Sequence, residues 1–318
     1  METIVPLCAK PISSARKTPG SGCASPCRKR AGAASNGLTV TPIERYQTAG
    51  SVFGVRGFRV MVIWGPIFLL AAALAWFGLP LLHRRIATAR LARLCKQHRA
   101  IVLTYDDGPS AGMTPAVADL LAQHRAKATS FMIGGFAQMH PALVTRLVGE
   151  GHEIGSHTQK HSNAWKTTPW GAMRDLVAGR QSLARLGVPT RLFRPPFGKT
   201  TLGTLIAGSG LGFAFWTIDP QDSWNRRPVA DILAEIDQKG GGVVLMHDFD
   251  LPRRGPTPAA HPAYLLALTE ALIGHAATKG YRILRLGDLP ARDAEKAAPV
   301  LRANHATSKN PPQTEAPA

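Results

Sequence analysis

The sequence predicts an α/β protein whose parallel strands are joined by crossover helices, either as a barrel or as a doubly wound sheet. Short apolar runs alternate with helical patterns from residue 100 onward, an alternation typical of parallel sheets. Prolines stand near the first turn of several expected helices, and glycines stand where helices should end. Polar and titratable residues follow five of the expected strands, at the rim where such folds gather their chemistry.

Residues 1–59 precede this alternation as a basic arm. They are rich in Ser, Gly, Pro, Lys and Arg, which favours a disordered segment. Most of the net charge of +18 lies in residues 1–99, so the high pI says little about the globular part. No nucleic-acid partner is expected, because only this arm would support one. The cysteines lie in the arm or just before the globular part and predict no disulfide framework: Cys8, Cys23, Cys27 and Cys95.

Residues 60–82 form an uncharged apolar run, VMVIWGPIFLLAAALAWFGLPLL. As a helix this run is about 34 Å long, enough to cross a bilayer core of about 30 Å. It exceeds the apolar segment of a signal peptide, which is about 7–15 residues. The run therefore predicts a single retained transmembrane helix.

Residues 83–99 are expected to be a basic juxtamembrane linker. More cations follow the apolar run than closely precede it, which favours a cytoplasmic C-terminal domain. The opposite side of the inner membrane stays an alternative for the C-terminal domain. Met61 is a second candidate start of the chain, in which case the arm is not translated.

The globular part is expected over 100–288, followed by an Ala- and Pro-rich disordered tail, 289–318. The expected strands are 101–105, 128–133, 152–156, 191–194, 212–218, 242–247 and 281–286. The expected helices are 114–125, 140–150, 169–187, 200–209, 228–238 and 262–279.

The histidines of GSHTQKHSN, His157 and His161, are a candidate metal-binding pair. Four residues apart, they would share one face of a helical turn and could hold one divalent ion. A carboxylate from the rim, Asp106 or Asp107, would complete a common catalytic zinc set with a position left for water. The second carboxylate could then accept a proton, which explains two adjacent like charges before a turn.

Three further positions suit a hydrolase. Arg194 in FRPPFG could clamp a carboxylate and hold it ionised. His247 ends a buried strand and could protonate a leaving amine. Asp219 or Asp222 in DPQDSW could orient that imidazole.

These segments resemble the NodB-homology polysaccharide deacetylases, carbohydrate esterase family 4. Five motifs stand in the family's order over 101–288: TYDDG, HTQKH, RPPF, DPQDSW and LMH. The resemblance implies a distorted (β/α)7-type barrel and a divalent metal, most often Zn²⁺, with Co²⁺ or another ion as alternatives. It also implies hydrolysis of N-acyl groups, usually acetyl, on amino sugars.

Carried over by position, the resemblance makes Asp106 the general base and His247 the general acid, with Arg194 bracing the base and Asp219 tuning the acid. It makes Asp107, His157 and His161 the metal ligands. The substrate-binding positions that it implies are Phe197, Leu245 and Trp224.

Three residues depart from the family pattern. Tyr105 replaces a usual Phe, and Phe197 replaces a frequent Tyr. Ser223 separates Asp222 from Trp224, which leaves open both the place of Trp224 and the choice between Asp219 and Asp222.

The expected function is deacetylation of a glycan such as chitooligosaccharide, peptidoglycan or exopolysaccharide. A lipid-linked amino sugar is an alternative substrate, which the membrane helix and Arg253–Arg254 would favour. A catalytically inactive, membrane-tethered glycan-binding module is a second alternative.

Overall fold

The computed structural model describes residues 52–250 and 260–289. Expectations for most of the basic arm, for Arg253–Arg254 and for nearly all of the C-terminal tail fall outside these residues. By its contacts the chain divides into two units, Met1–Phe53 and Gly54–Ala318. The description below concerns the second unit.

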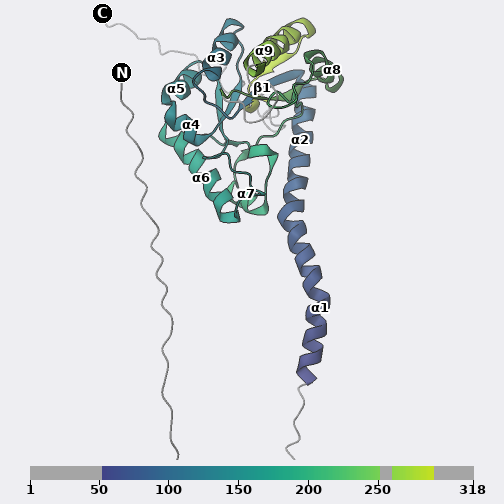
Figure 1. The fold of residues 1–318 in the computed structure, drawn as a ribbon. Helices are drawn as coiled ribbons and strands as arrows, with labels where there is room; N and C mark the ends of the chain where they lie inside the picture. The colour runs from purple at the N-terminus through teal and green to yellow at the C-terminus, as the bar shows by residue number, and fades with distance from the viewer. Residues whose placement is uncertain (1–51, 251–259, 290–318) are drawn as a thin grey trace, which may run out of the picture. The chain divides into compact units, whose positions relative to one another are not determined.

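Among the described residues of this unit, seven parallel strands form one curled sheet in the order β5-β4-β3-β2-β1-β6, with β7 paired to β1 (Figure 1). An isolated bridge between Ile218 and Val244 links the segment after β5 to β6. The sheet therefore has the curled (β/α) arrangement that was expected, and the doubly wound alternative is excluded. The strands are β1 Ala100–Asp106, β2 Thr129–Met132, β3 Glu153–Ser156, β4 Leu192–Phe193, β5 Gly212–Phe213, β6 Gly242–His247 and β7 Arg282–Leu284.

Strand β1 is the centre of this sheet and is buried along its whole length. A strand buried on both faces needs a continuous apolar run, which Ile101, Val102 and Leu103 provide. Its register places Asp106 beside His247 on β6 and beside Phe131 on β2. Two residues far apart in sequence are thus brought to one end of neighbouring strands.

Helices surround the sheet and bury their apolar faces against it (Figure 1). The helices that follow β1 are α3 Met113–Gln123, α4 Gly134–Met139, α5 Pro141–Gly149, α6 Pro169–Arg185, α7 Leu202–Ala207, α8 Val229–Lys239 and α9 Ala260–Lys279. Two short 3-10 turns, η2 Pro196–Gly198 and η3 Leu286–Asp288, complete the described elements of this part. The six expected helices appear in the expected order, whereas the short helix α4 was not predicted.

Two expected strands are much shorter than their apolar sequences suggest. Residues 191–194 and 212–218 form strands of only two residues each, β4 and β5, apart from the isolated bridge at Ile218. The carbonyl oxygens of Ala214 and Phe215 accept from the Arg194 guanidinium, at 3.4 and 3.5 Å, instead of extending the ladder. A buried cation therefore ends the strand that the apolar run alone would continue.

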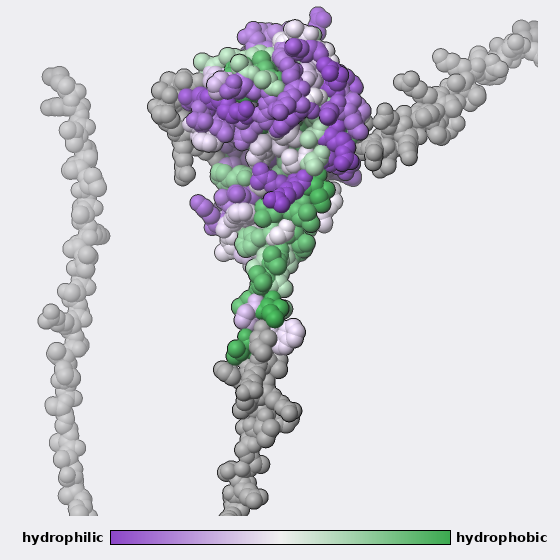
Figure 2. Space-filling model, turned by 90° about the vertical axis from the view of Figure 1, so that its right-hand side faces the viewer, coloured by the Kyte–Doolittle hydropathy of each residue, from purple (hydrophilic) through white to green (hydrophobic). Residues whose placement is uncertain are grey.

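A helical segment from Val52 to His98 leads into the sheet, as α1 Val52–Ala73, the π-helical stretch η1 Leu74–Gly78 and α2 Leu79–His98. The helix Trp64–His98 is long and apolar enough to cross a membrane by length and composition. Figure 2 shows hydrophobic residues concentrated on it and at the adjoining end of the domain, whereas the opposite end is mainly hydrophilic.

The expected linker, 83–99, lies almost entirely within α2, and the end of this helix packs on the sheet. Leu91, Leu94 and the fully buried Cys95 join Ala100 and Val102 in one apolar cluster. Nearer its start, Arg84 donates from Nη1 to the carbonyl oxygen of Gly198 at 3.2 Å. This part of the chain is helical because it covers apolar surface of the domain.

Candidate active site

Both carboxylates of the TYDDG motif are buried where β1 ends. Asp106 is the last residue of the strand, and Asp107 follows with a φ of 73°. This left-handed conformation is uncommon for a residue other than glycine. It turns the chain sharply enough for the two adjacent side chains to meet different partners.

The next turn is also closely packed. A Cβ atom on Gly108 would lie 2.5 Å from Oδ1 of Asp248, so only glycine fits there. Asp248 is buried and accepts from the Thr114 hydroxyl at 2.6 Å. Burial raises the pKa of Asp248 to about 7, against the lowering effect of Thr114.

His157 and His161 converge on Asp107, although they do not lie on a helix. They stand in the loop that follows β3, where Thr158 and His161 have φ values of 66° and 58°. The helical-face argument for this pair is therefore wrong, because tight loop turns and not a helical repeat bring the rings together. Their ring centroids are 4.9 Å apart.

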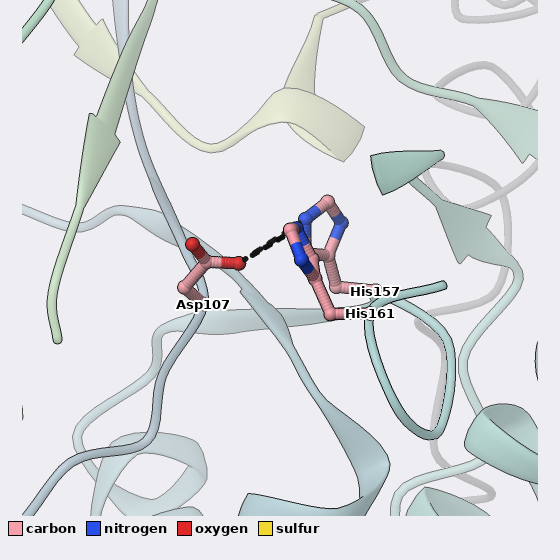
Figure 3. A group of neighbouring side chains, drawn as sticks. All are labelled: Asp107, His157 and His161. Carbon is pink, nitrogen blue, oxygen red and sulfur yellow. Dashed lines mark ion pairs between the residues drawn. The ribbon is translucent and has the colours of Figure 1, made fainter. Parts of the chain in front are cut away.

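Figure 3 shows both imidazoles facing the carboxylate of Asp107. Asp107 Oδ1 lies 3.1 Å from His161 Nε2 and 3.5 Å from His157 Nε2. One ligand atom from each of the three residues lies within 4.8 Å of the other two.

The hydrogen bonding of His157 also suits a metal ligand. Its Nδ1 is 2.8 Å from the carbonyl oxygen of Arg194, which can only accept. Nδ1 therefore carries a proton, and Nε2 faces Asp107. Metal-ligating histidines are commonly fixed in this way. Two imidazoles and one carboxylate are a donor set that fits a divalent ion such as zinc.

Arg194 is fully buried and holds the other carboxylate, Asp106. Its Nη1 donates to Asp106 Oδ1 at 2.8 Å and to the Thr104 hydroxyl at 2.7 Å. Its guanidinium carbon lies 4.1 Å from the centroid of the Phe131 ring. Burial lowers the pKa of Arg194, and the ionised Asp106 opposes this effect. The structure thus places Arg194 where the sequence predicted a clamp for a carboxylate.

The partner of His247 is Asp222, and the choice of Asp219 for this place is corrected. Asp222 Oδ1 lies 2.8 Å from His247 Nδ1, and Asp222 Oδ2 accepts from the His247 backbone N–H at 2.8 Å. Asp219 instead accepts from the backbone N–H of Gln221. Asp222 is fully buried, whereas Asp219 lines a cavity shared with His247.

Charge coupling dominates this pair. Burial alone would lower the pKa of His247, but the Asp222 carboxylate outweighs it and raises the pKa to about 10. Burial would likewise raise the pKa of Asp222, yet His247 and His261 hold it well below its usual range. The pair is therefore an imidazolium beside a carboxylate.

Two contributors to the site were missed by the sequence reasoning. His261 on α9 is buried, with Nε2 3.5 Å from Asp222 Oδ2 and its ring stacked on Phe249. No motif surrounds it, so the sequence offered no signal. Thr104 was detectable, because it lies two residues before Asp106 and so projects to the same side of β1.

Asp106, Asp107, His157, His161 and His247 line one cavity of about 690 Å³. The predicted substrate-binding residues Phe197, Leu245 and Trp224 all line it, and so does Asp219. Phe197 has a φ of 57° and packs its ring against His161, with centroids 4.6 Å apart. Trp224, which follows the extra residue Ser223, lines this cavity and is 58% exposed.

A parallel barrel whose rim offers a clamped carboxylate, a charged histidine and a metal-competent triad is the architecture of a hydrolase. The chain belongs to the polysaccharide deacetylase family. The profile of that family, described as polysaccharide deacetylase, matches residues 93–216.

Curated relatives support this membership. The chain is 35% identical over 159 residues to a chitooligosaccharide deacetylase of Bradyrhizobium sp. (strain ANU 289), covering 47% of this chain and 71% of that one. It is 32% identical over 156 residues to a peptidoglycan-N-acetylglucosamine deacetylase of Bacillus cereus, covering 47% of this chain and 73% of that protein. The chain is accordingly a deacetylase of carbohydrate esterase family 4, in which the hydrolysed bond is an N-acetyl amide.

Solved structures have the same fold. The peptidoglycan N-acetylglucosamine deacetylase Bc1960 aligns with a TM-score of 0.53 and 27% identity, over 61% of this chain and 89% of that one. BA3943 of Bacillus anthracis, described as a family pseudoenzyme, aligns with a TM-score of 0.52 and 20% identity, over 61% and 66%. Both alignments show that the fold is shared.

Proposed function

We propose that this protein removes N-acetyl groups from the amino sugars of a glycan, with a divalent metal, most simply zinc, held by Asp107, His157 and His161. The convergence of these three side chains beside the separately clamped Asp106 carries the proposal. The relatives act on chitooligosaccharide and on peptidoglycan N-acetylglucosamine, which gives the substrate class.

Asp106 is the general base in this proposal. Arg194 donates a hydrogen bond to Oδ1 of Asp106. The other oxygen, Oδ2, lies 3.9 Å from Nε2 of His157, on the side of the proposed metal ligands. Oδ2 is therefore the oxygen that takes a proton from the attacking water. The guanidinium hydrogen-bonds to this carboxylate and fixes its direction. A metal ion in the neighbouring site would polarise the acetyl carbonyl.

His247 is the general acid. Its Nδ1 donates to Asp222, so Nε2 is the nitrogen that can give a proton to the departing amine. Water adds to the acetyl carbon, the carbon–nitrogen bond breaks, and acetate and a free amino sugar leave. Leu245 and Phe197 provide apolar cavity walls that would contact the acetyl methyl group.

The direct test is acetate release by the full chain, purified in detergent and loaded with zinc, from chitooligosaccharide and from peptidoglycan fragments. Acetate release from either substrate that stops when a chelator removes the metal supports the proposal. Absence of release from both, with zinc bound, would contradict it and favour the inactive glycan-binding module.

A lipid-linked amino sugar remains the second candidate substrate. It is favoured by the apolar helix that runs into α2, because this helix would hold the domain at a membrane.

We expect Asp222→Asn to move the alkaline limb of the pH profile of kcat to lower pH. The carboxylate raises the pKa of His247, so the acid form persists until pH rises through that value. Without the negative charge the pKa falls, and activity should be lost at least about one pH unit earlier.

Asp219→Asn is the matched control, because this carboxylate lines the same cavity without bonding His247. Its alkaline limb should stay where it is. An unshifted limb in Asp222→Asn would mean that another group is the acid.

A further inference from the structure

The domain exposes large apolar side chains close to η1, within the helical segment that contains the apolar run 60–82. Trp170 at the start of α6 is 69% exposed, Ile206 on α7 is 61% exposed, and Trp165 in the preceding loop is 41% exposed. Exposed clusters of aromatic and aliphatic residues mark interaction surfaces. Trp165, Trp170 and Ile206 are called the interfacial face below.

The π-helical stretch η1 contacts this part of the domain directly. Phe77 packs edge-on against Trp165, with ring centroids 5.8 Å apart. Trp76 reaches α7, since a Cβ on Gly203 would lie 3.3 Å from the Trp76 ring, and the Met173 sulfur of α6 would lie 3.3 Å from the same atom. Trp170 and Ile206 stand one helical turn from Met173 and Gly203, so the interfacial face adjoins η1.

These contacts divide the apolar run 60–82. Up to about residue 75 the described side chains of the run are largely exposed, among them Phe68 and Leu70. Trp76 and Phe77 then contact the domain. Beyond them apolar side chains are exposed again, among them Leu81, Leu82 and Ile86, so the apolar surface of the helix continues alongside the domain.

We propose that the interfacial face rests in the headgroup region of the same bilayer that α1 enters. Trp and Tyr side chains favour that depth, because their rings are apolar and carry a polar group. Because the apolar surface of the helix continues past Trp76 and Phe77, which are held against the domain, a bilayer around this helix would reach the interfacial face. The catalytic domain is therefore seated on the membrane by its own surface.

The charges beside the face agree with a membrane carrying anionic lipids. Lys199 Nζ lies 4.1 Å from the centroid of the Trp165 ring, and Lys166 directly follows Trp165 in the chain. Among the described residues no carboxylate lies within 4 Å of either ammonium group. Cations next to interfacial aromatic residues attract anionic headgroups.

The active-site cavity opens next to this face. Trp165 donates from Nε1 to the carbonyl oxygen of Thr200 at 2.9 Å, in the loop that follows Phe197. Lys166 and Phe197 both line the cavity. A glycan would thus enter at the membrane surface. This seating depends on the insertion of α1 and not on the deacetylase reaction.

The test places an environment-sensitive fluorophore on single cysteines of the full chain, reconstituted in phosphatidylcholine–phosphatidylglycerol vesicles. Cys8, Cys23 and Cys27 are first changed to Ser, whereas Cys95 is fully buried and stays. Quenching by lipids brominated near the headgroup is compared with quenching by aqueous iodide.

Four positions are labelled: Trp170→Cys and Ile206→Cys on the face, Phe68→Cys on α1 and Ala122→Cys on an exposed part of α3. Figure 1 shows α3 at the end of the domain remote from α1. We expect the two face positions to lose fluorescence with brominated lipid, and Ala122→Cys to lose it only with iodide.

Phe68→Cys separates failure of the seating from failure of insertion. If it is quenched by lipid while both face positions are quenched only by iodide, α1 inserts and the seating is overturned. If all four positions are quenched only by iodide, insertion fails and the seating fails with it. Neither outcome depends on catalysis.

Discussion

Asp106→Asn is expected to lower kcat by about 10²–10⁴-fold, the usual contribution of a general base. The amide has nearly the shape of the carboxylate and can still accept from Arg194 through its oxygen. It cannot take a proton from water at neutral pH. The three residues of the metal-competent set are unchanged, so bound zinc should stay near one equivalent per chain.

The measurement is acetate release alongside zinc content by elemental analysis. Asp119→Asn is the control, since this carboxylate is exposed on α3 and pairs only with Arg146 among the described residues. Wild-type turnover by Asp106→Asn would remove Asp106 from the role of base. Loss of zinc in this variant would instead place Asp106 among the ligands.

His157→Ala is expected to abolish both zinc binding and turnover. It removes one of three donors and the ring that is fixed by the Arg194 carbonyl oxygen. Loss of a supporting hydrogen bond alone typically weakens metal affinity about 10–100-fold, so loss of a ligand should exceed about 100-fold.

Zinc affinity by competition with a chromophoric chelator checks this directly, without substrate. His124→Ala is the control, because His124 is exposed at the end of α3. Unchanged zinc affinity in His157→Ala would show that the three side chains lie together for another reason, such as simple hydrogen bonding.

The strands that carry the site were predictable where burial is complete. Both β1 and β6 are continuous apolar runs, and their parallel pairing brings Asp106 beside His247. The short length of β4 and β5 was not predictable. The Arg194 guanidinium hydrogen-bonds to carbonyl oxygens that would otherwise pair with a neighbouring strand. The position of the Arg194 side chain depends on Asp106, which lies 88 residues away in sequence.

The side-chain roles were harder to assign than the positions. Two acidic residues in DPQDSW are equivalent by composition, and only the fold shows that Asp222 is buried under His247. The spacing of His157 and His161 suggested a helix, whereas left-handed residues in a loop produce the same convergence. The burial of α2 was missed because its many arginines read as a solvated linker, although Leu91, Leu94 and Cys95 share one side.

The contact between Arg84 and Gly198 has a practical consequence for handling the enzyme. Gly198 closes the 3-10 turn that contains Phe197, and a Cβ there would lie 3.0 Å from the Arg84 guanidinium and 2.8 Å from the Trp216 ring. A shortened polypeptide starting near residue 90 would keep Leu91, Leu94 and Cys95 but lose this support beneath a wall of the cavity. Truncations intended for crystallography should therefore begin upstream of Trp76.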